Sequence, residues 1–196
     1  MSVNEKMTAI ADAIRAKTGG TDTLSLDEMA TEIASIESGG DSTDTLVEYL
    51  CGNYTDIVDE KTTALPTYIF AYSNMLTSYV GKCVVKMGVQ CFRANSSVTK
   101  VDFHTDFKED ANTYNIPVAT FYGCSALTTL ILRGGSVIQL DGVNAFTNSP
   151  IANGTGYIYV PSALVEDYKA ATNWTTYADQ IRAIEDYPDV CGEVSA

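Results

Sequence analysis

The sequence predicts an α+β fold in which a short β-solenoid follows an N-terminal helical hairpin and ends in a C-terminal helical cap. Three observations predict it. Apolar residues at helical spacing occur in residues 1–36. A phenylalanine-containing frame then recurs four times within residues 45–156, which indicates stacked repeats. Residues 157–196 read as a strand, a Val-Pro turn and helices, which suits a unit that covers the end of a stack.

The first 36 residues are predicted to form two amphipathic helices joined by a turn. Gly19 is placed to end the first helix, and Ser25 and Glu28 fit a capping box at the start of the second. Their apolar residues step by three and four, as in a coiled-coil seam. The seam residues are Val3, Met7, Ile10, Ile14, Leu26, Met29, Ile33 and Ile36. Helices this short bury such seams poorly alone, so we predict attachment to another protein or to copies of the chain. Packing against the main domain is the alternative.

Residues 37–44 are small, polar and glycine-rich, which indicates a linker before the repeats. The repeats begin with four pentapeptides, PTYIF, GVQCF, PVATF and GVNAF, each of which starts with Pro or Gly. They end at Phe70, Phe92, Phe121 and Phe146, at spacings of 22, 29 and 25 residues. We expect these four rings to stack in register along one side of the coils.

The residues after each phenylalanine share a second register. Apolar side chains occur six, nine and eleven residues on, completely in two units and partly in a third: Leu127, Leu130 and Leu132; Val98, Val101 and Phe103; and Leu76 and Tyr79. Gly81 interrupts the third unit, and the register is lost after Phe146, although the YIYV run at 157–160 supplies a later strand. Units of about 20 to 30 residues that end in Leu-x-x-Leu-x-Leu are typical of leucine-rich repeats, whose inward residues become buried as the coils stack.

The run FYGCSALTTLIL, residues 121–132, resembles the BspA-like leucine-rich repeat, in which phenylalanine and a Gly-Cys or Asn-Cys pair precede a Ser-Leu-Thr-x-Leu strand. Residues 157–184 resemble the closing unit that commonly follows such repeats. The resemblance implies a short solenoid with helices that hold Tyr168, Trp174 and Tyr177. The chain departs from the family pattern at Gly81, in the last repeat and in an insertion at about 104–116.

The residues of the closing unit support a cap without the resemblance. Pro161 halts the strand, and Ser162 can cap a helix that runs through Lys169. Trp174, the only tryptophan, is expected to pack this cap against the last coil.

Residues 5–36 resemble a short module found at the start of structural proteins of bacteriophages and prophages, where it is thought to join a tail or fibre component to the particle. The resemblance implies that the chain is made in the host cytoplasm and resides in the virion. It also implies that the N-terminal helices contact phage structural proteins. A homo-oligomer is expected, and a trimer is one option.

Composition limits the classes of function. The net charge is −13, from 12 Lys+Arg and 25 Asp+Glu, and we expect no basic patch and no nucleic-acid binding. No run of about 18 apolar residues is present, so no membrane insertion is expected. Glu5 and Asp12 interrupt any secretory signal. Five cysteines without a C-x-x-C pair favour neither a zinc site nor a disulfide framework, and Cys91 and Cys124 read as small core side chains in a protein that folds in a reducing cytosol.

The residue types that carry chemistry do not form a known motif. His104, the only histidine, lacks the context of a nucleophile motif and is expected to be a solvated loop residue. Asp106, Glu109 and Asp110 cluster as glycosidase carboxylates do, but a polar insertion normally carries hydrated charges. No phosphate-binding loop or calcium loop is present. We therefore predict no enzyme activity, no cofactor and no metal site.

The surface composition favours recognition. Twelve tyrosines with many Asn, Ser and Thr resemble the composition of antibody binding loops. The candidate recognition residues are Tyr72, Asn74, Asn112, Tyr114, Asn115, Tyr122, Asn148 and Asn153, with ordinary turn residues as the alternative. We predict a bacteriophage tail, fibre or decoration protein that recognises a host glycan or surface protein. The alternatives are a BspA-like bacterial adhesin and a glycan-acting enzyme whose site lies in the 104–116 insertion.

Overall fold

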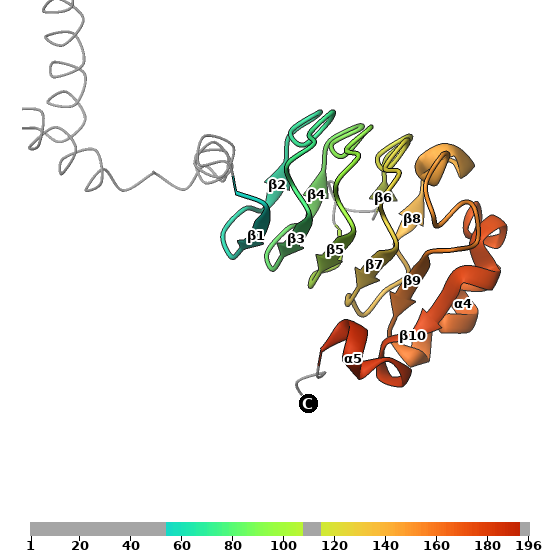
Figure 1. Cartoon of the computed structure of the whole chain (residues 1–196). Helices are drawn as coiled ribbons and strands as arrows, with labels where there is room; N and C mark the ends of the chain where they lie inside the picture. The colour runs from blue at the N-terminus through green and yellow to red at the C-terminus, as the bar shows by residue number, and fades with distance from the viewer. Residues whose placement is uncertain (1–53, 108–114, 193–196) are drawn as a thin grey trace, which may run out of the picture. The chain divides into compact units, whose positions relative to one another are not determined.

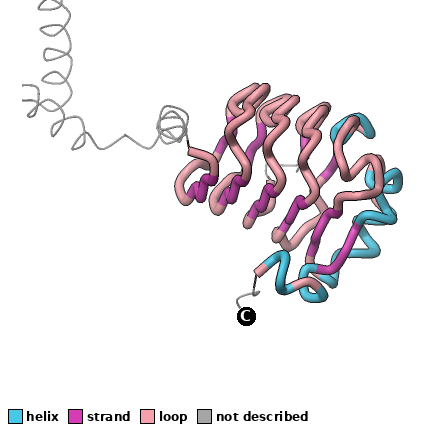
Figure 2. Tube along the Cα trace, in the orientation of Figure 1, coloured by secondary structure: helices cyan, strands magenta, loops and turns pink. Residues whose placement is uncertain are grey.

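The computed structural model describes residues 54–107 and 115–192 (Figure 1). The chain divides into two units, Met1–Asp41 and Ser42–Ala196. The expected helical hairpin with its eight seam residues, and the linker, lie outside the described residues and stay predictions. The described part of the second unit is α+β, with a six-stranded parallel sheet and short helices (Figure 2). Within that part, no helix is long and apolar enough to cross a membrane.

The main sheet contains six strands that all run parallel, in the order β1-β3-β5-β7-β9-β10. Their bounds are β1 (Asp56–Asp59), β3 (Ser78–Gly81), β5 (Lys100–Phe103), β7 (Thr129–Leu132), β9 (Tyr157–Val160) and β10 (Ile181–Ala183). Tyr79 pairs with Val101, Val101 with Leu130, and Leu130 with Ile158. The residues nine positions after Phe70, Phe92 and Phe121 therefore occupy equivalent places in neighbouring strands, as the sequence predicted.

A second row of short strands returns along the opposite side of each unit (Figure 1). It consists of β2 (Ala64–Leu65), β4 (Lys86–Met87), β6 (Asn115–Ile116) and β8 (Gln139–Leu140). β2 pairs with β4 and β6 with β8, again in parallel. The second residue of each points inward and is buried, as the two-residue period of a strand requires.

The four phenylalanines lie stacked, as expected. The ring centroids of Phe70 and Phe92 are 5.1 Å apart, those of Phe92 and Phe121 5.4 Å, and those of Phe121 and Phe146 5.4 Å. The last pair is parallel to within 2°. All four side chains are at most 1% exposed. This column of rings fills the interior where each unit turns and supplies much of the apolar burial that holds neighbouring units together.

Threonine hydroxyls donate hydrogen bonds to backbone carbonyl groups at the start of the main-sheet strands. The hydroxyl of Thr77 donates to the Thr55 carbonyl at 2.9 Å, that of Thr99 to Thr77 at 3.1 Å, and that of Thr128 to Thr99 at 3.3 Å. Each threonine is the residue before a main-sheet strand. The threonine row therefore joins successive units through hydroxyl-to-carbonyl hydrogen bonds that a valine, with the same shape, would lack.

Gly81 does not break the stack, contrary to the expected decay of the frame. It pairs with Phe103 in β5 and is buried. A Cβ atom there would lie 2.8 Å from Val84 Cγ2 and 2.9 Å from Tyr79 Cε1. The unit thus keeps the register, and glycine fits because Val84 and the large Tyr79 ring occupy the space next to it, where Phe103 and Leu132 stand in the next two units.

The last unit differs from the others in spacing, not in pairing. Ile158 lies twelve residues after Phe146, whereas Leu130 lies nine after Phe121. A longer turn before Gly156 absorbs the difference, and the Tyr157 N–H still donates to the Thr128 carbonyl at 2.8 Å. The lost register is therefore regained in β9.

The C-terminal segment closes the end of the stack (Figure 1). It contains the 3₁₀ helix η2 (Ser162–Leu164), the helix α4 (Val165–Ala170) and the 3₁₀ helix η3 (Trp174–Gln180). Trp174 is fully buried, donates its Nε1–H to the Ile138 carbonyl at 2.6 Å and lies 6.1 Å from the Phe146 ring. The expected packing of the cap by Trp174 is confirmed.

One detail of the cap was predicted wrongly. Ser162 makes no side-chain cap, because the segment starts as a 3₁₀ helix and turns α-helical only at Val165. Its backbone N–H is instead satisfied by the Glu185 carboxylate at 2.9 Å. A distant acceptor therefore replaces the local hydroxyl.

The last residues of the described chain cover part of the outer face of the main sheet. η4 (Ile184–Asp186) and α5 (Pro188–Cys191) bring Ile184 and Cys191 against Ile131 and Tyr159 in a small apolar cluster. The Lys100 ammonium donates to the Val190 carbonyl at 2.8 Å. A cation here satisfies an acceptor at a helix C-terminus, where positive charge is favourable.

Candidate functional site

The turn edge is the part of the fold that repeats most closely from unit to unit. We define it as residues 66–73, 88–95, 117–124 and 142–149, which surround the four stacked phenylalanines and form the row of loops beyond β2, β4, β6 and β8 in Figure 1. In all four segments the phenylalanine points inward, so the neighbouring residues are presented outward in equivalent places.

The turn edge depends on backbone in the left-handed region. The residue two positions after each phenylalanine has a positive φ: 60° at Tyr72, 53° at Ala94, 74° at Gly123 and 60° at Asn148. In this conformation the N–H groups of the first three donate to a carbonyl of the next unit, at 2.8, 2.7 and 2.8 Å. The left-handed backbone therefore directs N–H groups toward the next unit for hydrogen bonding. The pentapeptide pattern in the sequence did not reveal this role.

A second left-handed column lies two positions before the phenylalanine. Tyr68, Gln90 and Ala119 have φ values of 62°, 59° and 55°. In the last unit this place is taken by the 3₁₀ helix η1 (Val143–Phe146). Glycine or asparagine is the usual choice for such backbone, because other side chains crowd the neighbouring carbonyl.

The structure separates the eight predicted recognition residues. Tyr72, Tyr122 and Asn148 lie on the turn edge, and Asn74 follows its first segment. Asn153 lies exposed in the longer turn of the last unit. The other three belong elsewhere: Asn112 and Tyr114 lie outside the described residues, and Asn115 is in β6.

Asn115 is therefore not a turn residue, and its side chain is already engaged. Its Nδ2 donates to both carboxylate oxygens of Asp141, at 3.1 and 3.0 Å. This pair joins β6 to the end of β8 and accounts for Asn115 as a structural residue.

Tyr122 and Asn148 form part of a connected polar group. The Arg93 guanidinium lies 4.7 Å above the centre of the Tyr122 ring, and its Nη1 donates to Gln90 Oε1 at 3.3 Å. Asn148 Nδ2 donates to the Tyr122 hydroxyl at 3.4 Å. These contacts fix the direction of an arginine that keeps most of its donors for other partners.

Sequence reasoning missed three exposed apolar residues beside Tyr72. Tyr68 is 52% exposed, Met75 44% and Val89 41%, and Tyr72 itself is 68% exposed. Tyr68 lies next to Val89, because its N–H donates to the Val89 carbonyl at 3.4 Å. The four residues Tyr68, Tyr72, Met75 and Val89 are called the tyrosine patch below.

The charge pattern of residues 61–101, the segment that contains this patch, was also missed. Residues 61–101 contain no Asp or Glu, although the chain carries 25 of them. The same stretch contains five basic residues, Lys61, Lys82, Lys86, Arg93 and Lys100. A count of charges along the sequence would have found this segregation, which the net charge of −13 conceals.

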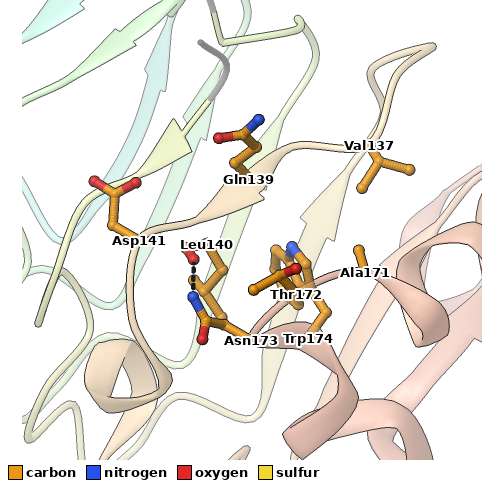
Figure 3. Close-up of a pocket in the computed structure, with 8 residues that line it drawn as sticks. All are labelled: Val137, Gln139, Leu140, Asp141, Ala171, Thr172, Asn173 and Trp174. Atoms are coloured by element: carbon orange, nitrogen blue, oxygen red, sulfur yellow. Dashed lines mark hydrogen bonds between the residues drawn. The ribbon is translucent and has the colours of Figure 1, made fainter.

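An open pocket of about 590 Å³ lies between β8 and the loop that follows α4 (Figure 3). Gln139 of β8 and Asp141, the residue after this strand, line one side of the pocket, and Thr172 and Asn173 of the loop line the other. Asn173 Nδ2 donates to the Leu140 carbonyl at 2.6 Å, and Asp141 is held by Asn115. Asp141 is the only ionisable residue among those that line the pocket, so the pocket lacks an acid–base pair.

A smaller pocket of about 310 Å³ lies at His104, between the ends of β5 and β7. Its wall includes Arg133, whose Nε and Nη2 donate to the two carboxylate oxygens of Asp102, each at 2.9 Å. His104 Nε2 lies 3.6 Å from Asp102 Oδ1, beyond hydrogen-bond distance. Because Arg133 occupies this carboxylate, Asp102 does not orient His104 as the acid of a catalytic dyad would.

The electrostatics of this pocket follow from the same contacts. Burial lowers the pKa of His104, and the charges of Arg133 and Lys82 act in the same direction, while Asp102 opposes them. The hydrogen bonds to Asp102 raise the pKa of Arg133. His104 is exposed in the loop after β5, as expected for a solvated loop histidine, although burial of part of its ring lowers its pKa.

The acidic cluster expected at 106–110 cannot be assembled from the described residues. Glu109 and Asp110 lie outside them. Asp106 Oδ1 accepts a hydrogen bond from the Ser136 N–H at 3.0 Å. The same oxygen would lie only 2.3 Å from a Cβ atom added to Gly134, so glycine is needed there. Asp106 thus holds the loop after β7. Within the described ranges, no group of three or more His, Cys, Asp or Glu residues could hold a metal ion.

The described cysteines fit a structural role. Cys91 and Cys124 are fully buried, as expected, and neither forms a disulfide. Burial raises the pKa of the Cys124 thiol to about 12 and that of Cys91 well above its usual range. Cys124 Sγ donates to the Phe92 carbonyl at 3.0 Å, so it also joins two units.

Comparison of the chain with models of protein families finds no match, and comparison with curated proteins finds no significant match.

Proposed function

We propose that this chain is a non-enzymatic structural protein of a bacteriophage particle, a tail, fibre or decoration component that recognises the host surface. In this proposal the stacked units form a short leucine-rich-repeat-like solenoid of the BspA type. The N-terminal helices attach it to other phage structural proteins or to further copies of the chain.

One observation carries the recognition role: the turn edge combines a constant backbone with varied outward side chains. One position after the phenylalanine, the four units present Ala71, Arg93, Tyr122 and Thr147 on the same local framework. Loops that carry function on a rigid scaffold have this form, since the core fixes the positions while the exposed residues are free to differ.

The chemistry of the described residues supports binding over turnover. Asp102 and Asp106 are engaged with Arg133 and the Ser136 N–H, as described above. Tyr and Arg, which the edge presents, supply large contact area and directed hydrogen bonds at low entropic cost.

The attachment role is tested on particles. Mass spectrometry and immunogold electron microscopy of phage particles released by the bacterium that encodes the chain should find it at a defined position. Deletion of residues 1–36 should remove it from the particle while the protein remains soluble in the lysate. Its absence from purified particles, with display on the bacterial envelope, would favour the adhesin and refute the proposal.

Oligomerisation and enzyme activity have separate tests. Sedimentation of the full chain should show an oligomer that dissociates in an Ile10→Asp, Ile33→Asp variant. A monomeric wild-type chain that also fails to bind phage proteins would remove the proposed role of the helices. Turnover of host cell-wall polysaccharide that is lost in Asp106→Asn would show a glycan-acting enzyme instead of a binder.

A further inference from the structure

The tyrosine patch contains two residues that the fold does not need. Tyr68 and Tyr72 both occupy left-handed backbone, at φ values of 62° and 60°. Smaller or more flexible residues serve at the equivalent places of other units, Gln90 and Ala119 for Tyr68 and Ala94, Gly123 and Asn148 for Tyr72. A bulky side chain is strained in this conformation, and such residues tend to be retained where a site uses them. The backbone bond that Tyr72 makes to Arg93 needs only its N–H, which any residue except proline supplies.

The two rings also contribute little to the interior. Within the described part of the chain, neither ring packs against another aromatic ring, and neither hydroxyl has a hydrogen-bond partner. More than half of each side chain is exposed. Val89 lies beside Tyr68 in the next unit, Met75 follows the first turn segment, and both are exposed. The patch is therefore an exposed apolar and aromatic surface whose two tyrosines sit on strained, left-handed backbone.

The charges around the patch select the kind of partner. The chain has a net charge of −13, so most of its surface repels an anionic polymer. The turn edge is the exception: its four segments contain no Asp or Glu, and Arg93 is their only charged residue. Arg93 lies on the turn edge beside this patch, with its guanidinium held over the Tyr122 ring and its direction fixed by Gln90. An anionic ligand therefore meets one arginine and no carboxylate along the turn edge, on a chain whose net charge is otherwise negative.

The shape of the patch favours an extended chain molecule over a protein face. A stable protein interface buries about 800 Å² on each partner around an apolar core, whereas this patch consists of four exposed side chains along one edge. Sugar rings present C–H groups that fit against the electron-rich face of a tyrosine. Two exposed tyrosines four residues apart in the first turn segment supply two such platforms.

We propose that the tyrosine patch binds an anionic polysaccharide, with Tyr68 and Tyr72 stacked against sugar rings and Arg93 paired with an acidic substituent. This inference rests on the proposed recognition function and specifies its ligand class and surface.

The test uses the full chain and affinity electrophoresis through gels that contain alginate, polygalacturonate, hyaluronan or heparin, with dextran as the neutral polymer. At least one anionic polymer should retard the wild-type chain, and dextran should not. Tyr68→Asn with Tyr72→Asn should weaken that binding by tenfold or more. Arg93→Gln should weaken it several-fold and reduce its dependence on salt.

The controls separate loss of binding from loss of folding. Asn is favoured in left-handed backbone, so the double variant should melt at the same temperature as the wild type or higher. Val58→Thr changes a valine of β1 that is 53% exposed and lies outside the turn edge, and it should leave binding unchanged.

The proposal is overturned by failure to bind any of the four anionic polymers, by equal binding to dextran, or by full binding in the folded double variant. Self-association that depends on Tyr72 would also overturn it, because the occupant would then be a second copy of the chain. None of these results bears on whether the chain is present in phage particles, so this inference and the proposed function fail separately.

Discussion

The column of phenylalanine rings predicts how the fold responds to loss of one ring. Phe121 is fully buried and lies between Phe92 and Phe146, each with its ring centroid 5.4 Å away. Replacement of a buried phenylalanine by alanine costs about 3–5 kcal/mol through lost transfer free energy and the cavity left behind. A ring stacked on both faces lies toward the upper part of that range, so Phe121→Ala should lower the free energy of unfolding by about 4 kcal/mol.

Urea unfolding of the full chain measures this change, and Trp174 is the reporter because it is the only tryptophan and lies 6.1 Å from the Phe146 ring. With a slope of about 2 kcal/mol per molar urea, the midpoint should fall by about 2 M. Phe121→Leu retains most of the apolar volume and should cost about 1 kcal/mol. A loss below about 2 kcal/mol in Phe121→Ala would refute the claim that this ring is a central element of the stack.

A double-mutant cycle separates stacking from burial. Leucine substitutions at Phe92 and Phe121 should couple by about 0.5–1.5 kcal/mol, the energy of an aromatic pair beyond its buried area. The same substitutions at Phe70 and Phe121 should be additive, since Phe92 lies between them. Equal coupling in both pairs would indicate that the column does not act through nearest neighbours.

The remaining predictions concern the cap, the strand ends and the core thiols. Fluorescence of Trp174 should resist quenching by acrylamide in the native chain and become quenchable on unfolding, and easy native quenching would contradict its burial. Arg133→Lys should destabilise the chain by about 2 kcal/mol in urea titrations, because a lysine cannot make the two parallel bonds to Asp102. The pKa of His104 is lowered in the fold, so the unfolded chain binds more protons between that lowered value and about 6.5, and stability should rise with pH across this window. A wild-type chain whose melting temperature falls as pH rises there, relative to His104→Gln, would contradict the sign. Since burial raises the pKa of Cys124 to about 12, peptide mapping should find it unmodified by iodoacetamide in the native chain at pH 8, and rapid labelling would refute its burial.

Apolar periodicity predicted the framework well because burial decides it. Residues such as Leu130 and Val101 repeat at fixed distances from an inward phenylalanine, and parallel strands that pair in register place them together. Gly81 looked like a failure of the pattern only because its reason lies in a neighbour: the Tyr79 ring fills the space. The sequence pattern shows that a position holds a small residue, but it does not show which neighbouring side chain leaves no room for a larger one.

The candidate surface was less predictable, because exposed residues are not constrained by packing. Tyr72 was identified from composition, but Tyr68 was not, since left-handed backbone at both positions follows from hydrogen bonds between units that no pentapeptide encodes. Asn115 was grouped with exposed residues, but its backbone pairs with Gln139 in a strand and its side chain is held by Asp141. The absence of carboxylates from residues 61–101 was visible in the sequence and required only a local count of charge.

The regained register of β9 has a consequence for how this protein can change over generations. Each strand takes its alignment from the strand beside it, so extra residues in the turn before Gly156 leave the alignment of the sheet intact. A lineage can therefore lengthen or replace individual loops by small insertions and can add whole units by duplication, while the interior stays fixed. Variation would gather in the exposed loops, while the buried residues that hold the units together stay the same.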